Sequence, residues 1–155
     1  GRSIYRASPI VNGGPLPPRV GVKTNYALMF EIRIFSNTIQ NAEMRAIVPA
    51  HVRWEKQIFP SSARIVFDEG TGDVRWNIGE IPAGTGVFTP ALTAAFQVSI
   101  TPSDLDRGKI LSLLKDIKLT GTDSFTGERV EVSMRDLTTE LRDDTPANSQ
   151  EWTVQ

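Results

Sequence analysis

The residue types that most often carry catalysis are scarce in this chain. His51 is the only histidine, and there is no cysteine. A histidine that acts as a general base needs a nucleophile or an oriented water beside it, and zinc sites usually need several nitrogen or sulfur ligands. We therefore predict no catalytic, cofactor-binding or metal-binding residue, and we expect His51 to be a surface turn residue.

Carboxylates gather in three short stretches, and these are the places where a calcium ion would be sought. The stretches are FDEGTGD, SDLDRG and LRDD, with the acids Asp68, Glu69, Asp73, Asp104, Asp106, Asp143 and Asp144. Calcium takes about six to eight oxygen ligands, more than any one of these stretches provides. We predict solvated turn acids, with calcium binding left as an open alternative. A glycosidase pair gains no support from the spacing.

Glycines and arginines offer two further candidate sites. AGTG and GTGD resemble phosphate loops, but such a loop precedes a helix, and strand-like sequence follows both of these. Arg45, Arg53, Arg64 and Arg75 fall at outward strand positions with acids nearby. With a net charge of −1, we predict a mixed solvated face and no nucleic-acid partner.

Large aromatic residues are the remaining candidates for a binding surface. Trp76 shares a strand face with two aliphatic residues, so we predict that it packs in the core. Trp54 lies in a less regular strand that fits a sheet edge; core packing is preferred, but Trp54 and Phe35 are the two candidate partner-binding residues. Trp152 stands in a polar tail and is expected to be the most exposed tryptophan.

Strands must position these residues, because alternation with a period of two dominates the chain. In YALMFEIRIF, five apolar residues share one face: Tyr26, Leu28, Phe30, Ile32 and Ile34. AEMRAIVP, HVRW, ARIVF, DVRWNI and ALTAAFQVSI repeat the pattern, and DEGTGD, IPAGTG and TDSFTGE separate strands as turns. The pattern predicts an all-β protein, an antiparallel immunoglobulin-like β-sandwich of about seven strands.

One stretch mixes two periodicities. SDLDRGKILSLLKDIKL spaces its apolar residues like a helix, and Ser103 with Asp106 has the spacing of a capping box. However, Gly108 falls inside the helical pattern, and alternation returns by Ile117. We predict a loop with a short helical turn, followed by a strand from about Leu113.

A chain of 155 residues suits one domain. We expect an N-terminal extended segment or edge strand over residues 1–20, the β-sandwich over 21–142, and a polar tail or linker over 143–155. No apolar run approaches the ~18 to 20 residues of a membrane span, so we predict no direct membrane insertion by these residues.

The region from GPLPPRVG to TGTDSFTG resembles the conserved-repeat domain of bacterial and archaeal surface proteins, a family of immunoglobulin-like β-sandwiches. The pieces that carry the resemblance are FEIRIFSNTIQNAEMRAIVPAHVRWEKQIFPSS, FDEGTGDVRWNIGEIPAGTG, FQVSITPS and IKLTGTDSFTG. Asn37 stands at the family's asparagine turn, and His51 stands where glycine is common. The resemblance implies a wall- or membrane-attached protein built from repeated modules.

These expectations point to a non-enzymatic spacer module of a larger cell-surface protein, located outside the cell, with any anchor outside these residues. Its partners would be neighbouring modules. The alternative is an adhesion module that binds a glycan or a protein through its end loops or a sheet edge. An enzyme is the least favoured class, and no cofactor is expected.

Overall fold

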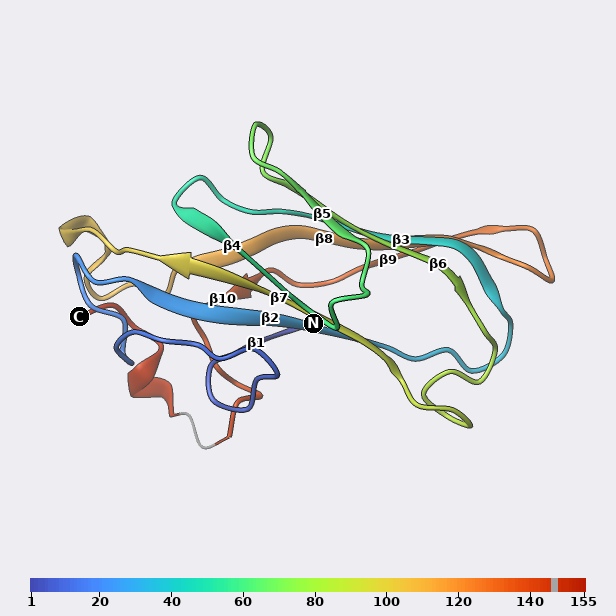
Figure 1. Ribbon diagram of the computed structural model, residues 1–155, viewed down its shortest axis with the longest axis horizontal. Helices are drawn as coiled ribbons and strands as arrows, with labels where there is room; N and C mark the ends of the chain where they lie inside the picture. Colours follow the sequence, from blue (N-terminus) through green and yellow to red (C-terminus); the bar gives the residue numbers. More distant parts are fainter. Residues whose placement is uncertain (146–147) are drawn as a thin grey trace.

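Alternating apolar residues give each of two antiparallel sheets one face to bury, and the sheets pack together on these faces (Figure 1). The computed structural model describes residues 1–145 and 148–155. In the described part, the helices are two short 3₁₀ turns, and neither is long and apolar enough to cross a bilayer.

The smaller sheet has the strand order β1 (Arg2–Ile4), β2 (Thr24–Ile32), β7 (Leu92–Ile100), β4 (Val52–Phe59). The larger sheet has the order β10 (Leu137–Thr138), β8 (Ser112–Asp123), β3 (Ile39–Ile47), β6 (Asp73–Ile81), β5 (Ile65–Asp68), and β9 (Arg129–Ser133) also pairs with β8. The predicted immunoglobulin-like sandwich is confirmed. The ten strands of the described residues exceed the expected seven or so, partly because β1 and β10 are only three and two residues long.

The core lies between the two sheets. Trp76 on β6 is 4% exposed and lies opposite Met44 of β3 and Ile65 of β5, which confirms its predicted packing role. Phe30 of β2 and Phe96 of β7 stack with ring centroids 5.9 Å apart. These contacts join neighbouring strands and make the interior continuous.

The stretch with mixed periodicity folds as predicted. A 3₁₀ turn, η1 (Asp104–Asp106), precedes β8, which begins at Ser112. The Asp106 carboxylate accepts a hydrogen bond from the Ser103 backbone N–H at 2.8 Å, as in a capping box, and a second one from the Ser103 hydroxyl at 2.7 Å. The helical spacing before Leu113 therefore produces one 3₁₀ turn, and the alternating residues after it form the strand β8.

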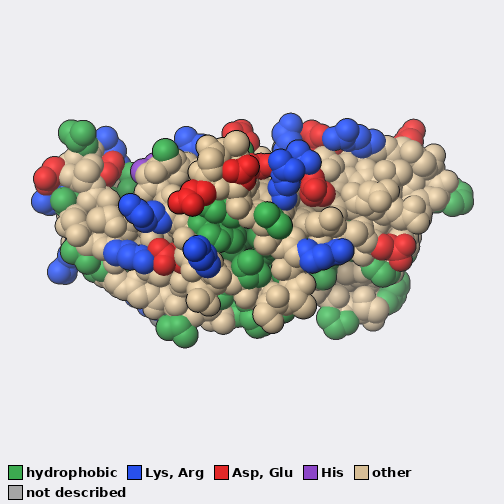
Figure 2. Space-filling view, turned by 45° about the horizontal axis from the view of Figure 1, so that its top comes forward, with side chains coloured by type: hydrophobic (Ala, Val, Ile, Leu, Met, Phe, Trp, Pro, Cys, Tyr) green, Lys and Arg blue, Asp and Glu red, His purple; other side chains and the backbone are tan. Residues whose placement is uncertain are grey.

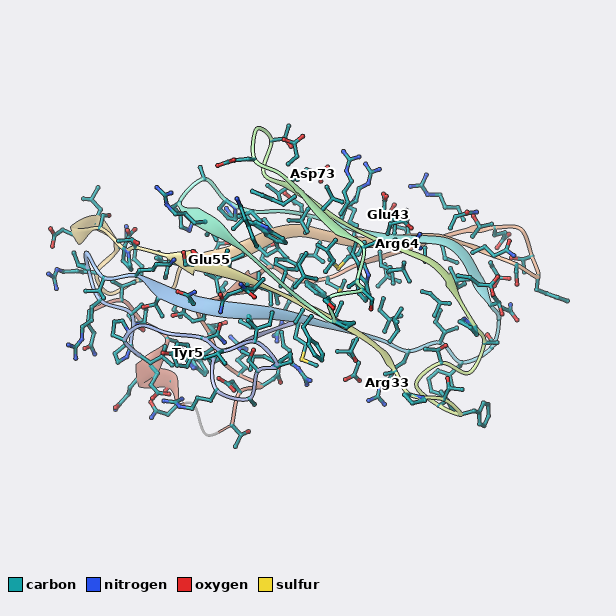
Figure 3. All side chains as sticks on the ribbon, viewed as in Figure 1. Tyr5, Arg33, Glu43, Glu55, Arg64 and Asp73 are labelled. Carbon is teal, nitrogen blue, oxygen red and sulfur yellow. The ribbon has the colours of Figure 1, made fainter. Side chains whose placement is uncertain are left out.

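The outer face of the smaller sheet is covered rather than solvated. Ala27, Ala95 and Gln97 point away from the core face and are nevertheless buried. The Gln97 side chain donates to the Val11 carbonyl at 2.8 Å, so the irregular segment after β1 lies across this face. Figure 3 shows Tyr5 in that segment, on the side of the smaller sheet that faces away from the larger one.

Asp144, which was expected to be a solvated turn acid, is instead buried. It is 1% exposed, and its carboxylate accepts hydrogen bonds from the backbone N–H groups of Tyr5, Arg6 and Ala7, at 2.7 to 2.8 Å. Arg6 also forms a bidentate ion pair with Glu151, at 2.9 and 2.6 Å. We call this group of contacts the terminal clasp.

The described residues of the expected polar tail, 143–155, dock on the sandwich; Pro146 and Ala147 lie outside the described residues. Val154 is 2% exposed, and the Trp152 carbonyl accepts a hydrogen bond from Thr139 Oγ1 at 2.6 Å. Trp152 itself is half-buried and packs against the core rather than standing in solvent. The polar composition of this segment suggested a solvated tail. The segment docks instead through backbone hydrogen bonds, which the polarity of its side chains does not reveal.

Candidate binding surface

Trp54, the first candidate, fills the seam between the two sheets. It lies on the edge strand β4, half-buried, and its ring is 5.1 Å from the ring of Phe67 and 4.8 Å from that of Phe96. Register shifts between Trp54 and Ile58, where Lys56 has φ = 59°, which explains the irregular pattern of this strand. The stacking supports a packing role, and its binding role stays a prediction.

Figure 2 brings the β4–β5 side of the molecule forward. Hydrophobic side chains gather near the middle of this face, with charged side chains on both sides of them. On β5, Val66 is 66% exposed. This side is therefore a secondary candidate surface, since β4 and β5 are both outermost strands of their sheets.

Phe35, the second candidate, belongs to a larger group of exposed aromatic residues. It is 77% exposed in the loop between β2 and β3. Phe88 in the β6–β7 loop is 87% exposed, and Phe125 in the β8–β9 loop is 85% exposed. All three loops turn at the same end of the sandwich, on the right in Figure 1. We call residues 33–38, 82–91 and 123–128 the Phe end.

Hydrogen bonds tie the three loops of the Phe end to one another. The Ile34 N–H donates to the Thr85 carbonyl at 2.8 Å, and the Ser124 N–H donates to the Thr38 carbonyl at 2.9 Å. The Asn37 side-chain amide donates to Asp123 at 2.8 Å. Three loops from separate strand pairs thus form one frame, and the phenylalanines project from that frame rather than from independent tips.

Two glycines allow this frame to close. Gly84 and Gly86 both have φ = +79°. A Cβ atom on Gly84 would lie 2.7 Å from the Phe88 ring, and one on Gly86 would lie 2.5 Å from Cγ of Arg33. The AGTG stretch is therefore a turn that brings Phe88 and Arg33 close to the backbone, in agreement with its rejection as a phosphate loop.

The charges at the Phe end are partly matched by neighbours. Arg33, labelled in Figure 3, lies at this end and pairs with Glu31 at 2.5 Å. Asp123 accepts hydrogen bonds from the backbone N–H groups of Phe125 and Thr126, at 2.8 and 3.0 Å. The Asn37 amide, followed by the Thr126 and Phe125 N–H groups, lowers the pKa of Asp123 below its usual range.

Asp123→Ala should loosen the loop that carries Phe125, because the N–H groups of Phe125 and Thr126 lose their acceptor. We expect about tenfold faster hydrogen exchange at these two amides, the scale of one hydrogen bond to a charged group. Because the folded-state pKa is lowered, the carboxylate's contribution is complete above about pH 4 and is lost as pH falls through that lower pKa. Glu128→Ala, which removes another carboxylate of the same hairpin, is the control. Equal exchange in both variants would contradict this role for Asp123.

His51 and the acids predicted from the sequence belong to segments outside the Phe end. His51 is exposed, with Nε2 2.9 Å from the Ser112 carbonyl oxygen, as predicted for a surface turn residue. Asp68 accepts from the Gly70 N–H at 2.9 Å, and Asp73 pairs with Arg75 at 2.6 Å. Within residues 1–145 and 148–155, no three His, Cys, Asp or Glu side chains are grouped to hold a metal ion.

Sequence reasoning selected Phe35 but missed Phe88 and Phe125. A usable signal was present, since each phenylalanine stands among turn-forming residues, in FSN, GVFTP and DSFTG. A large apolar residue between turn residues has no alternating strand to bury it. What the sequence does not show is that three separate turns meet at one end.

No family model matches this sequence, and no curated protein matches it either. Among solved structures, it is similar to BcpA, the major pilin subunit of Bacillus cereus, with 11% identity and a TM-score of 0.49. The similarity covers 79% of this chain and 36% of that one, so the chain spans about a third of the pilin's length. An uncharacterized protein of Nocardia farcinica with an immunoglobulin-like fold is 19% identical over 92% of this chain and 94% of that one, with a TM-score of 0.33. Identities this low transfer no partner or activity to this chain.

Proposed function

We propose that this chain is a non-enzymatic structural module of a larger cell-surface protein, and that it makes its contacts through the Phe end. The cell-surface location rests on the resemblance to the conserved-repeat family. The contact surface rests on one observation, the three phenylalanines that are at least 77% exposed on loops bonded to each other.

Solvent-exposed aromatic rings on a fixed frame are suited to binding. Aromatic residues are enriched at protein interfaces, where their burial supplies much of the binding energy. Because the loops are already held together, binding would order little additional chain, and the entropic cost of association is reduced. A protein or a glycan with apolar recesses is the partner class that this surface fits.

Phe35→Ser/Phe88→Ser/Phe125→Ser should weaken partner binding strongly while leaving the fold intact, since all three side chains are exposed. We would pass the purified domain over cell-wall preparations, a glycan panel and host matrix proteins, and expect at least tenfold weaker retention of the triple variant.

Val66→Ser is the matched control, because Val66 is 66% exposed on β5, outside the Phe end. It should bind like the unmodified chain. Binding that survives the triple variant and disappears with Val66→Ser would instead assign the contact to the β4–β5 side.

A further inference from the structure

The end of the sandwich opposite the Phe end also exposes apolar side chains. Leu105 in η1 is 81% exposed, and Val22 and Ile110 are 45% and 44% exposed. We call residues 19–23 and 101–110 the Leu105 end; in Figure 1 these segments lie on the left, away from the Phe end. The molecule therefore exposes apolar side chains at both ends of its long axis.

The Leu105 end is also a bonded frame. The Gly21 N–H donates to the Pro102 carbonyl at 2.8 Å, and the Gly108 N–H donates to the Val154 carbonyl at 2.9 Å. The Val20 N–H donates to the Gln155 carbonyl at 2.9 Å. The loops at both ends are therefore held in place before any association. This lowers the entropic cost of binding one end to the other.

The two ends carry opposite net charge. The Phe end contains one cation, Arg33, and two acids, Asp123 and Glu128, for a net charge of −1. The Leu105 end has a net charge of +2, from four cations and two acids: Arg19, Lys23, Arg107, Lys109, Asp104 and Asp106. Lys23 also pairs with Glu55 at 2.7 Å; without Lys23 the Leu105 end still has a net charge of +1.

We infer that the partner of the Phe end is the Leu105 end of a second copy of this module, so that copies associate head to tail. This inference rests on the proposed function of the Phe end. Contact between two Phe ends, or between two Leu105 ends, would bring like charges together and is disfavoured. Contact between a Phe end and a Leu105 end brings opposite charges together and is favoured. The two surfaces differ, so the contact is heterologous, and because they lie at opposite ends of the long axis, it builds an open chain of modules rather than a closed dimer.

The available area is of the right order for a weak specific contact. A buried phenylalanine contributes about 150 to 250 Å². Three of them together contribute roughly 450 to 750 Å², which is below the ~800 Å² per partner of a standard interface and in the range of a weak one. Burying the exposed parts of Leu105, Ile110 and Val22 on the other side would complete an apolar centre with a charged rim.

Sedimentation velocity over a concentration series tests this arrangement. The unmodified chain should form a ladder of species that grows with concentration. The Phe end variant Phe35→Ser/Phe88→Ser/Phe125→Ser and the Leu105 end variant Val22→Ser/Leu105→Ser/Ile110→Ser should each remain monomeric. Val11→Ser, at a residue that is 94% exposed and belongs to neither end, should associate like the unmodified chain.

The decisive sample is an equimolar mixture of the two variants. Each variant keeps one intact end, so head-to-tail contact predicts that the mixture forms dimers and nothing larger. A Leu105 end variant that dimerises by itself would overturn the inference in favour of contact between two Phe ends. An unmodified chain that stays monomeric throughout would also overturn it, while retention on another partner, lost in the Phe end variant, would leave the proposed function standing.

Discussion

Trp76→Ala should lower the free energy of unfolding by about 3 to 5 kcal/mol, the range for removing a buried aromatic side chain. Trp76 is 4% exposed at the centre of β6, opposite residues of both β3 and β5. Its removal would leave a cavity between the two sheets, beneath β3, β6 and β5. In thermal unfolding, the melting temperature should fall by about 10 °C or more.

Val66→Ala on the adjacent strand is the control, since that side chain is 66% exposed and its truncation should change stability by less than about 0.5 kcal/mol. Trp76→Phe should fall between the two, because it keeps an aromatic ring in the core. A Trp76→Ala protein as stable as Val66→Ala would show that the sheets do not depend on this ring. It would reopen the possibility that Trp76 serves a binding role.

The burial of Trp76 was predictable because alternation is a local signal. Val74 and Trp76 fall on one face of a strand whatever the rest of the chain does, and a strand between two turns has only one core to face. The same local logic predicted the hairpin at DEGTGD and the start of β8. The break in alternation after Trp54 likewise matches the register shift that the structure shows in the edge strand β4.

Contacts between distant segments were not predictable in this way. Asp144 reads as a tail acid because its partners are the backbone N–H groups of residues 5–7, which lie more than 130 positions earlier. Backbone donors leave no trace in the sequence. Ala27 similarly falls on a nominally exposed face, and it is buried on the face that the segment following β1 crosses.

The binding surface was predictable in part: its residues could be chosen from local sequence, but their grouping could not. Phe35 could be selected as an exposed aromatic residue from its own turn, and Phe88 and Phe125 could have been selected in the same way. Their grouping depends on which loops share an end, and that follows from the order of strands in the two sheets. Local sequence therefore predicts the pieces of the Phe end, and the topology assembles them.

Asp144→Ala should release the terminal clasp and lower the free energy of unfolding by about 3 kcal/mol, because three backbone N–H groups lose a shared charged acceptor. Hydrogen exchange at Tyr5, Arg6 and Ala7 should rise sharply, and urea unfolding should shift to lower concentration.

Asp143→Ala is the matched control, since the neighbouring side chain is exposed, and it should change neither quantity. The Arg6–Glu151 ion pair alone should not hold the segments together, because Arg6 is 37% exposed and such surface pairs contribute about 0 to 1 kcal/mol. If Asp144→Ala behaved like Asp143→Ala, the clasp would contribute nothing to stability. If it behaves as expected, one buried carboxylate joins the segment after β1 to the C-terminal segment and thereby stabilises both.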